Sequence, residues 1–124
     1  VQDWQMIRFY GKAHSLAILA LALKFSLESD CFSKVLDKSY LLLLIYLLTA
    51  PTIHPWYLIT LLALGAISKH PSAILWSLTI ILSYAAYTMN PIELPLWIVA
   101  LQFIPVVISL TSSSFRSFLE KKLL

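Results

Sequence analysis

This chain consists of long apolar runs separated by short polar breaks. The apolar runs predict helices rather than strands. The runs continue over roughly 14 to 20 residues without the period-two alternation that lipid-facing strands require. The expected helices cover residues 7–27, 40–53, 55–68, 72–89 and 96–113. The fold class that we expect is therefore all-α, because helices satisfy their backbone groups internally.

The polar breaks predict the connections between these helices. The stretch Glu28–Lys38 holds three acids and two lysines, which is the composition of a solvated loop. Pro51 and Pro55 cannot both lie inside one regular helix, so we expect a broken helix there. Pro105 falls inside the fifth run and should kink it, with the freed carbonyl met by a neighbouring helix or by the Ser109 hydroxyl.

The amino-acid composition indicates that these helices belong to a membrane domain. Hydrophobic residues make up 60% of the chain and charged residues 12%, whereas ordinary soluble domains are about a quarter charged. A compact domain of this size still exposes about a third of its unfolded surface, so this sequence needs lipid around it. We expect residues 1–124 to form one polytopic transmembrane domain with about five spans.

The distribution of basic residues predicts the orientation of these spans. One side receives Lys34, Lys38, Lys69 and a basic tail, whereas the other receives Arg8 and Lys12. The positive-inside rule makes the first side cytoplasmic and leaves the turns 51–55 and 90–95 outside.

The tail, residues 115–124, is expected to be cytoplasmic and helical. Phe115, Phe118 and Leu119 have the i, i+3, i+4 spacing of one apolar stripe, which could lie on the inner leaflet. The serines at 112–114 should cap this helix.

The sequence lacks the residue patterns of nucleic-acid-binding sites and of metal sites. The basic residues form no stripe interleaved with aromatics, so we expect no nucleic-acid binding. His14, His54 and His70 are too far apart for a zinc site, and Cys31 has no partner at ligand spacing. We expect no metal and no cofactor.

The most informative motif is Pro-Thr-Ile-His-Pro-Trp-Tyr at residues 51–57. A break at the membrane edge leaves backbone groups beside water, His54 supplies a titratable donor, and Trp56 and Tyr57 supply amphipathic rings. These residue types suit a phosphate-bearing lipid. The alternative is that the rings are interfacial anchors and the histidine is only solvated.

This motif resembles the "P-T-V-H-P-W-Y" signature of bacterial polyprenyl-phosphate-dependent mannosyltransferase-like proteins, which are GT-C membrane glycosyltransferases. The segments Leu75–Ser77, Leu82–Tyr84 and Leu96–Ile98 are similar to helices that follow the signature, so the likeness covers about residue 40 to the end. The resemblance implies a multi-pass enzyme of the bacterial inner membrane that takes a sugar from a lipid-phosphate carrier at the extracytoplasmic face.

The resemblance also implies which residues take part. His54, Trp56 and Tyr57 would bind the polyprenyl-phosphate sugar donor. The family's catalytic acid lies in an upstream loop that has no match here, so we assign no catalytic residue and do not carry that role onto Asp3 or Glu93. The chain would then be a piece of a larger protein, inactive without the remainder.

A non-enzymatic membrane module, such as part of a transporter or an assembly subunit, is the alternative function. Transporters should place polar or charged residues at mid-membrane depth, whereas the helix centres here hold almost none, with Gln102 the clearest exception. This weakens the transporter alternative but leaves it open.

Overall fold

A computed structural model describes residues 3–50, 53–88 and 95–123, and this part of the chain is helical, without β-strands. The expected all-α fold class is confirmed. The chain forms two compact units, unit 1 (Val1–Ile53) and unit 2 (His54–Leu124).

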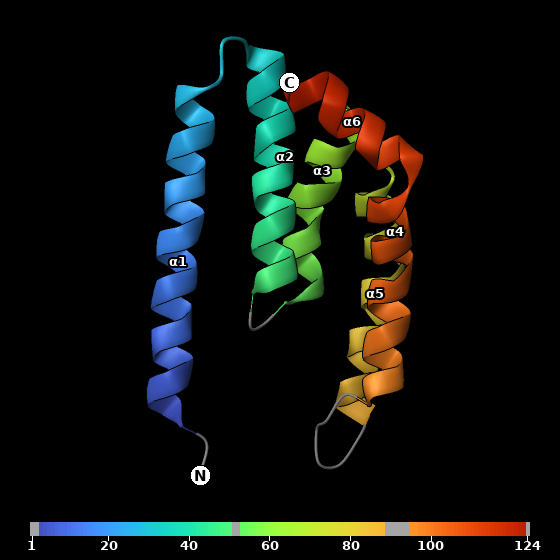
Figure 1. The fold of residues 1–124 in the computed structure, drawn as a ribbon. Coiled ribbons are helices and arrows are strands. Elements are labelled where there is room, and N and C mark those ends of the chain that lie inside the picture. Colours follow the sequence, from blue (N-terminus) through green and yellow to red (C-terminus); the bar gives the residue numbers. More distant parts are fainter. Residues whose placement is uncertain (1–2, 51–52, 89–94, 124) are drawn as a thin grey trace. The chain divides into compact units, whose positions relative to one another are not determined.

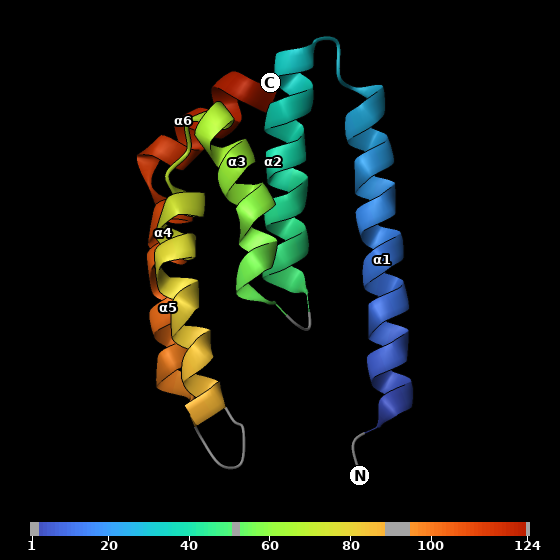
Figure 2. The ribbon, with the colours of Figure 1, turned by 180° about the vertical axis from the view of Figure 1, so that it is seen from behind.

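Unit 1 is a hairpin of two helices, α1 (Trp4–Leu27) and α2 (Phe32–Thr49), which lie side by side (Figures 1 and 2). No residue of α1 is buried. On α2 the buried positions recur every three or four residues, which is the spacing of one helix face. They are Asp37, Lys38, Tyr40, Leu41, Leu44 and Leu47.

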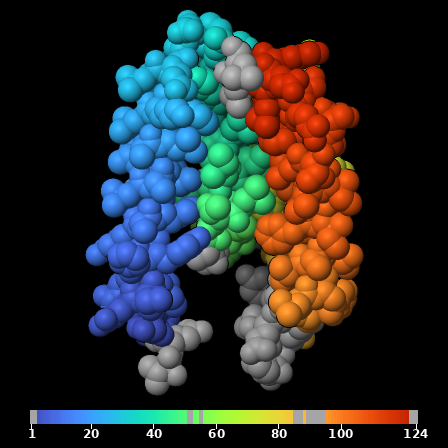
Figure 3. All heavy atoms as spheres, in the orientation of Figure 1, coloured from blue at the N-terminus to red at the C-terminus, as the bar shows by residue number. Residues whose placement is uncertain are grey.

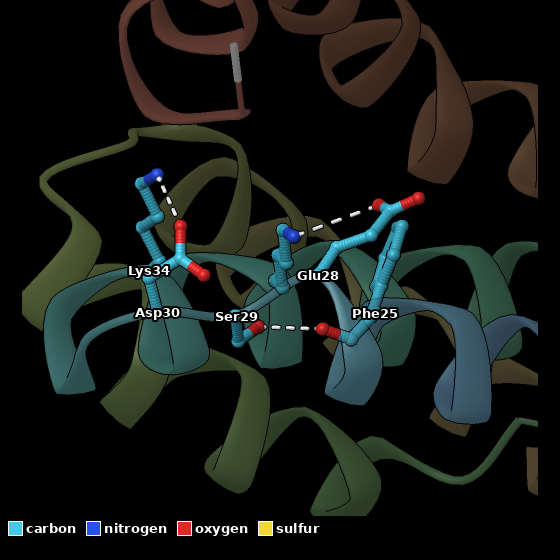
Figure 4. A network of polar contacts seen from close by, with 6 residues as sticks. Phe25, Glu28, Ser29, Asp30 and Lys34 are labelled. Atoms are coloured by element: carbon cyan, nitrogen blue, oxygen red, sulfur yellow. Dashed lines mark hydrogen bonds and ion pairs between the residues drawn. The ribbon is translucent and has the colours of Figure 1, made fainter.

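The prediction of a loop at Glu28–Lys38 is wrong over most of that stretch, because α2 already begins at Phe32. Contacts within unit 1 explain how charged residues fit into this helix. The Lys38 ammonium lies 3.6 Å from the Glu28 carboxylate and 5.7 Å from the centre of the Phe25 ring. Figure 4 shows this network together with the ion pair between Lys34 and Asp30, 3.5 Å apart. The composition of this stretch suggested a loop in solvent. The ion pairs of its charged residues allow it to form the first turns of α2 instead.

Unit 2 begins with a short 3₁₀ helix, η1 (Pro55–Tyr57), that leads directly into α3 (Leu58–Ser68). After a turn, α4 (Ser72–Thr79) continues as the 3₁₀ helix η2 (Ile80–Thr88). The chain then forms α5 (Leu96–Thr111) and α6 (Ser113–Leu123). α4 contacts both α3 and α5 (Figures 1 and 2). The α-helix is interrupted between Thr49 and Leu58, as expected at the proline motif, although Pro51 and Thr52 themselves lie outside the described residues.

Trp76 of α4 is fully buried and is the largest side chain in the core of unit 2. Its indole packs against the Phe103 ring of α5, with centroids 5.6 Å apart. α3 and α5 each bury one narrow stripe. These stripes are Leu58, Leu61, Gly65 and Ser68 on α3, and Ile98, Gln102, Val106 and Ser109 on α5.

α5 continues through Pro105, whose missing N–H leaves the Leu101 carbonyl oxygen without its helical donor. Thr79 Oγ1 donates to the Gln102 carbonyl oxygen at 2.9 Å, which joins α4 to α5. Ser109, the hydroxyl that the sequence suggested, is buried and has no hydrogen-bond partner among the described residues. The partner expected for the carbonyl that Pro105 frees, that of Leu101, stays a prediction, because the Thr79 bond goes to the next carbonyl along the helix.

The tail is helical, as the spacing of its apolar residues predicted, but its apolar face has another role. The axis bends by 56° between α5 and α6, and Ser112 caps α6 by accepting from the Phe115 backbone N–H at 3.3 Å. The rings of Phe115 and Phe118 contact the His70 ring, with centroids 4.9 and 5.4 Å away. Because Phe118 is buried, the stripe packs on the α3–α4 turn rather than lying wholly on a leaflet.

Large apolar side chains are exposed along α1 from Trp4 to Leu27. Figure 3 shows the side chains of this helix, in blue, along its whole length. By length and composition α1 can cross a membrane, and the bent pair α5 and α6 makes a second candidate if it forms one span. The described parts of α3 and of α4 with η2 are apolar but shorter. Among the residues that the structure describes, one or two candidate spans are found, whereas the sequence suggested about five.

Candidate functional site

His54, Trp56 and Tyr57 form one aromatic cluster at the start of unit 2. The His54 and Trp56 rings stack in parallel, with centroids 4.4 Å apart and planes inclined by 2°. The Tyr57 ring stands edge-on to both, at 5.4 Å from His54 and 5.8 Å from Trp56. The three residues that the motif singled out are therefore brought together.

The backbone of the η1 turn sets this arrangement. The Tyr57 N–H donates to the His54 carbonyl oxygen at 2.9 Å, which closes a single tight turn. Proline is well suited to the first position of such a turn because its φ is already fixed and it needs no donor. The turn runs directly into α3, so the cluster sits at the N-terminal end of that helix.

The cluster is accessible. Trp56 is 52% exposed and Tyr57 42%, while His54 is half-buried. The His54 ring nitrogens make no hydrogen bond with any described residue. A neutral imidazole offers one donor and one acceptor, and a protonated one offers two donors. The site can thus present a hydrogen-bond donor between two exposed aromatic faces.

An apolar groove of about 230 Å³ has Leu58, the residue after Tyr57, in its wall, whereas none of the three ring residues of the cluster lines it. Leu58 and Ile59, which follow Tyr57 directly, form one wall with Leu62. The opposite wall comes from α4 and η2 and consists of Ser77, Ile80, Ile81 and Tyr84. The polar donor of His54 is therefore followed along α3 by a surface suited to hydrocarbon.

A second polar cluster, in unit 1, was not predicted from the sequence. Tyr10 donates its hydroxyl to the Thr49 carbonyl oxygen at 2.6 Å, and His14 Nε2 lies 2.6 Å from Thr49 Oγ1. The Thr49 hydroxyl also donates to Ile45 O at 2.7 Å, which leaves its oxygen able to accept from His14 Nε2. The i, i+4 spacing of Tyr10 and His14 could have indicated a shared polar face. These bonds tie α1 to the end of α2.

His70 occupies the turn between α3 and α4 and serves a structural purpose. Its Nδ1 lies 2.8 Å from Ser72 Oγ and accepts from the Ser72 backbone N–H at 3.3 Å. Burial lowers the pKa of His70 below its ordinary value of about 6.5, because the charged form is poorly solvated there. The ring is therefore neutral at physiological pH and holds the first turn of α4.

The structure describes Asp3, one of the two acids considered in the sequence, but not Glu93. Asp3 is exposed and precedes α1 without a side-chain capping bond, and Glu93 lies outside the described residues. Among the residues that the structure describes, no three His, Cys, Asp or Glu side chains gather as a metal site. Comparisons with protein-family models, curated proteins and solved structures found no match.

Proposed function

We propose that the chain is the membrane-embedded carboxy-terminal part of a glycosyltransferase, mannosyltransferase-like, that uses a lipid-phosphate-linked sugar. In this proposal His54, Trp56 and Tyr57 hold the head of the polyprenyl-phosphate sugar donor at the extracytoplasmic face. The observation that carries the proposal is the stacked His54–Trp56 pair with Tyr57 edge-on, exposed beside an apolar groove.

Each part of a lipid-phosphate sugar has a matching surface in unit 2. The imidazole of His54 donates to a phosphate oxygen, and protonation would make that bond charge-assisted. The exposed Trp56 and Tyr57 rings flank the head group and supply the apolar faces and polar tips that suit a membrane boundary. The prenyl chain lies in the groove that starts at Leu58.

Multi-pass insertion in the bacterial inner membrane belongs to the same proposal. α1 is about 36 Å long at 1.5 Å per residue, which exceeds a hydrocarbon core of about 30 Å. α4 with η2 reaches about 30 Å because a 3₁₀ helix rises about 2.0 Å per residue. The apolar faces left exposed on α3 and α5 support further crossings, since lipid can cover them. The catalytic acid comes from the remainder of the full-length chain.

A non-enzymatic membrane module is the second candidate, and α1 is the observation that favours it. This helix is apolar and buries no residue, so it offers its surface to lipid or to other membrane helices. An assembly subunit would use such a helix without needing a ligand at His54.

Binding of farnesyl phosphate, a short polyprenyl phosphate, by the full chain in nanodiscs separates these functions. We expect His54→Ala to weaken binding about tenfold to a hundredfold, because a hydrogen bond to a charged group contributes about 1.5 to 3 kcal/mol. Trp56→Leu should also weaken binding, whereas Trp97→Leu, which removes another exposed indole, should not. Equal binding by wild type and His54→Ala would favour the non-enzymatic module.

A further inference from the structure

The turn between α3 and α4 forms an open hollow of about 280 Å³ at the opposite end of α3 from the aromatic cluster. The wall combines a small-residue surface, one aliphatic side chain and one cation. It consists of Gly65, Ala66, Lys69, His70, Pro71 and Ile74.

Lys69 has a backbone conformation that fixes where its side chain starts. Its φ of 58° and ψ of 39° place it in the left-handed region, and its N–H bonds to Gly65 O. The His70 N–H bonds to the same carbonyl at 3.1 Å. The Lys69 bond is that of an αL cap and the His70 bond is the longer bond of a Schellman cap, and in both motifs glycine or asparagine is the usual residue at the left-handed position. A lysine at this position has a modestly strained backbone, because a residue with a Cβ atom is disfavoured in the left-handed region. Its side chain projects from the helix end.

The charge at this end of unit 2 is not balanced. Lys69 is exposed and makes no ion pair with any described residue. Because Phe115 and Phe118 contact His70, α6 brings Arg116 and Lys121, both exposed, to the same end. Glu120 is the one acid of the described part of unit 2, and its i, i+4 spacing from Arg116 lets it offset that residue. The net charge left facing out is positive.

The surroundings of the hollow are apolar as well as cationic. Ile74, in the wall, is 49% exposed, and Ile67, two residues before Lys69 in the sequence, is 56% exposed. An anion from bulk water would gain nothing from these side chains. A phospholipid with an anionic head group would place its phosphate at Lys69 and its acyl chain along Ala66 and Ile74.

We propose that the α3–α4 turn binds one anionic phospholipid, with Lys69 holding the head group and the Ala66–Ile74 surface receiving the acyl chain. This inference is independent of the donor site at His54. The neutral His70 ring positions the turn through Ser72 and through the α6 phenylalanines, and it adds no charge to the site.

The test uses the full chain in nanodiscs of phosphatidylcholine with spin-labelled phosphatidylglycerol as the probe. We expect wild type to select the labelled phosphatidylglycerol over labelled phosphatidylcholine about fivefold, the preference that one basic residue near the surface provides. Lys69→Asn suits the left-handed backbone and should abolish this preference, whereas Lys69→Arg should keep it. Lys34→Gln is the matched control, because Lys34 is already paired with Asp30.

A second substitution separates a built site from simple surface charge. Ala66→Phe fills the hollow while leaving Lys69 in place, and we expect it to reduce the preference about as much as Lys69→Asn does. Inorganic phosphate should not displace the labelled lipid. Retention of the preference in either Lys69→Asn or Ala66→Phe, or an equal loss in Lys34→Gln, would overturn the proposal. Displacement by inorganic phosphate would do so as well, since it would indicate a phosphate site without an acyl-chain surface.

Discussion

The imidazole of His54 lies flat on the indole of Trp56, with ring centroids 4.4 Å apart. This stacking fixes the plane of the histidine, and the edge-on contact with Tyr57 limits its rotation. A side chain that is already oriented loses less conformational entropy when it binds a ligand. The rings of Trp56 and Tyr57 should therefore contribute to the affinity for the lipid donor nearly as much as the His54 nitrogens do.

Cysteine labelling in intact cells checks the proposed orientation. In a Cys31→Ser background, Asp3→Cys should react with an impermeant thiol reagent added outside, whereas Lys69→Cys should react only after the membrane is opened. The reason is that the positive-inside rule predicts the lysine-rich connections to be cytoplasmic. Labelling of Lys69→Cys but not Asp3→Cys in intact cells would invert the orientation.

The Glu28–Lys38 ion pair should stabilise the hairpin of unit 1. Glu28→Gln leaves the Lys38 side chain, which is only 6% exposed, without its carboxylate. We expect a loss of about 1 to 2 kcal/mol in the free energy of unfolding, measured by denaturant titration in detergent. Asp30→Asn, which breaks the exposed pair with Lys34, should cost less than about 0.5 kcal/mol. Equal losses in the two variants would show that burial of Lys38 carries no extra cost.

The Thr79 hydroxyl should stabilise the contact between α4 and α5. Thr79→Val keeps the shape of the side chain but removes the bond to Gln102 O, and we expect a loss of about 0.5 to 1.5 kcal/mol in the same titration. Thr111→Val is the matched control, because that hydroxyl bonds only to carbonyls of its own helix. A Thr79→Val protein no less stable than the control would mean that the bond between the helices contributes nothing.

The stability of unit 2 should fall in mild acid because of His70. Burial lowers the pKa of His70 in the folded chain, so the unfolded chain binds a proton at a higher pH than the folded chain does. The stabilisation is complete above about pH 6.5 and is lost as the pH falls toward the folded pKa. The thermal unfolding midpoint of wild type should therefore drop between about pH 7.5 and pH 5.

His70→Asn is the control for this pH dependence. Asparagine can place an acceptor near the Nδ1 position, where Ser72 donates, but it does not titrate. Its unfolding midpoint should change less over the same pH range. A drop as large as that of wild type would assign the acid sensitivity to other groups.

The sequence predicted the helices well wherever apolar residues alone define them. The run expected over 96–113 is α5, Leu96–Thr111, and the paired prolines fall where α2 and α3 are separate. Ser112 was also recognisable as a cap, because a serine before an amphipathic stretch is a local signal.

Contacts that depend on tertiary pairing could not be predicted in the same way. The start of α2 was missed because the burial of Lys38 depends on Glu28 and Phe25, which precede the helix. The packing of His70 on Phe118 joins residues far apart in the chain. The 3₁₀ geometry of η2 has no signal in its apolar sequence, which suits an α-helix equally well.

At the candidate site the sequence predicted the residue set but not its geometry. The spacing of His54, Trp56 and Tyr57 indicated one turn, yet the parallel stacking depends on the closed η1 bond between Tyr57 and His54. The groove beside it also needs side chains from η2, which are distant in sequence.

Sugar transfer from a polyprenyl-phosphate sugar by the full-length enzyme tests the central claim most directly. His54→Ala and Tyr57→Phe are compared with wild type and with Tyr46→Phe, another exposed tyrosine, at matched membrane expression. We predict that His54→Ala lowers donor use about tenfold to a hundredfold, that Tyr57→Phe lowers it less, and that Tyr46→Phe leaves it unchanged. If His54→Ala changes neither the apparent affinity for the lipid donor nor the turnover, the aromatic cluster is only a structural turn and the proposed function is contradicted.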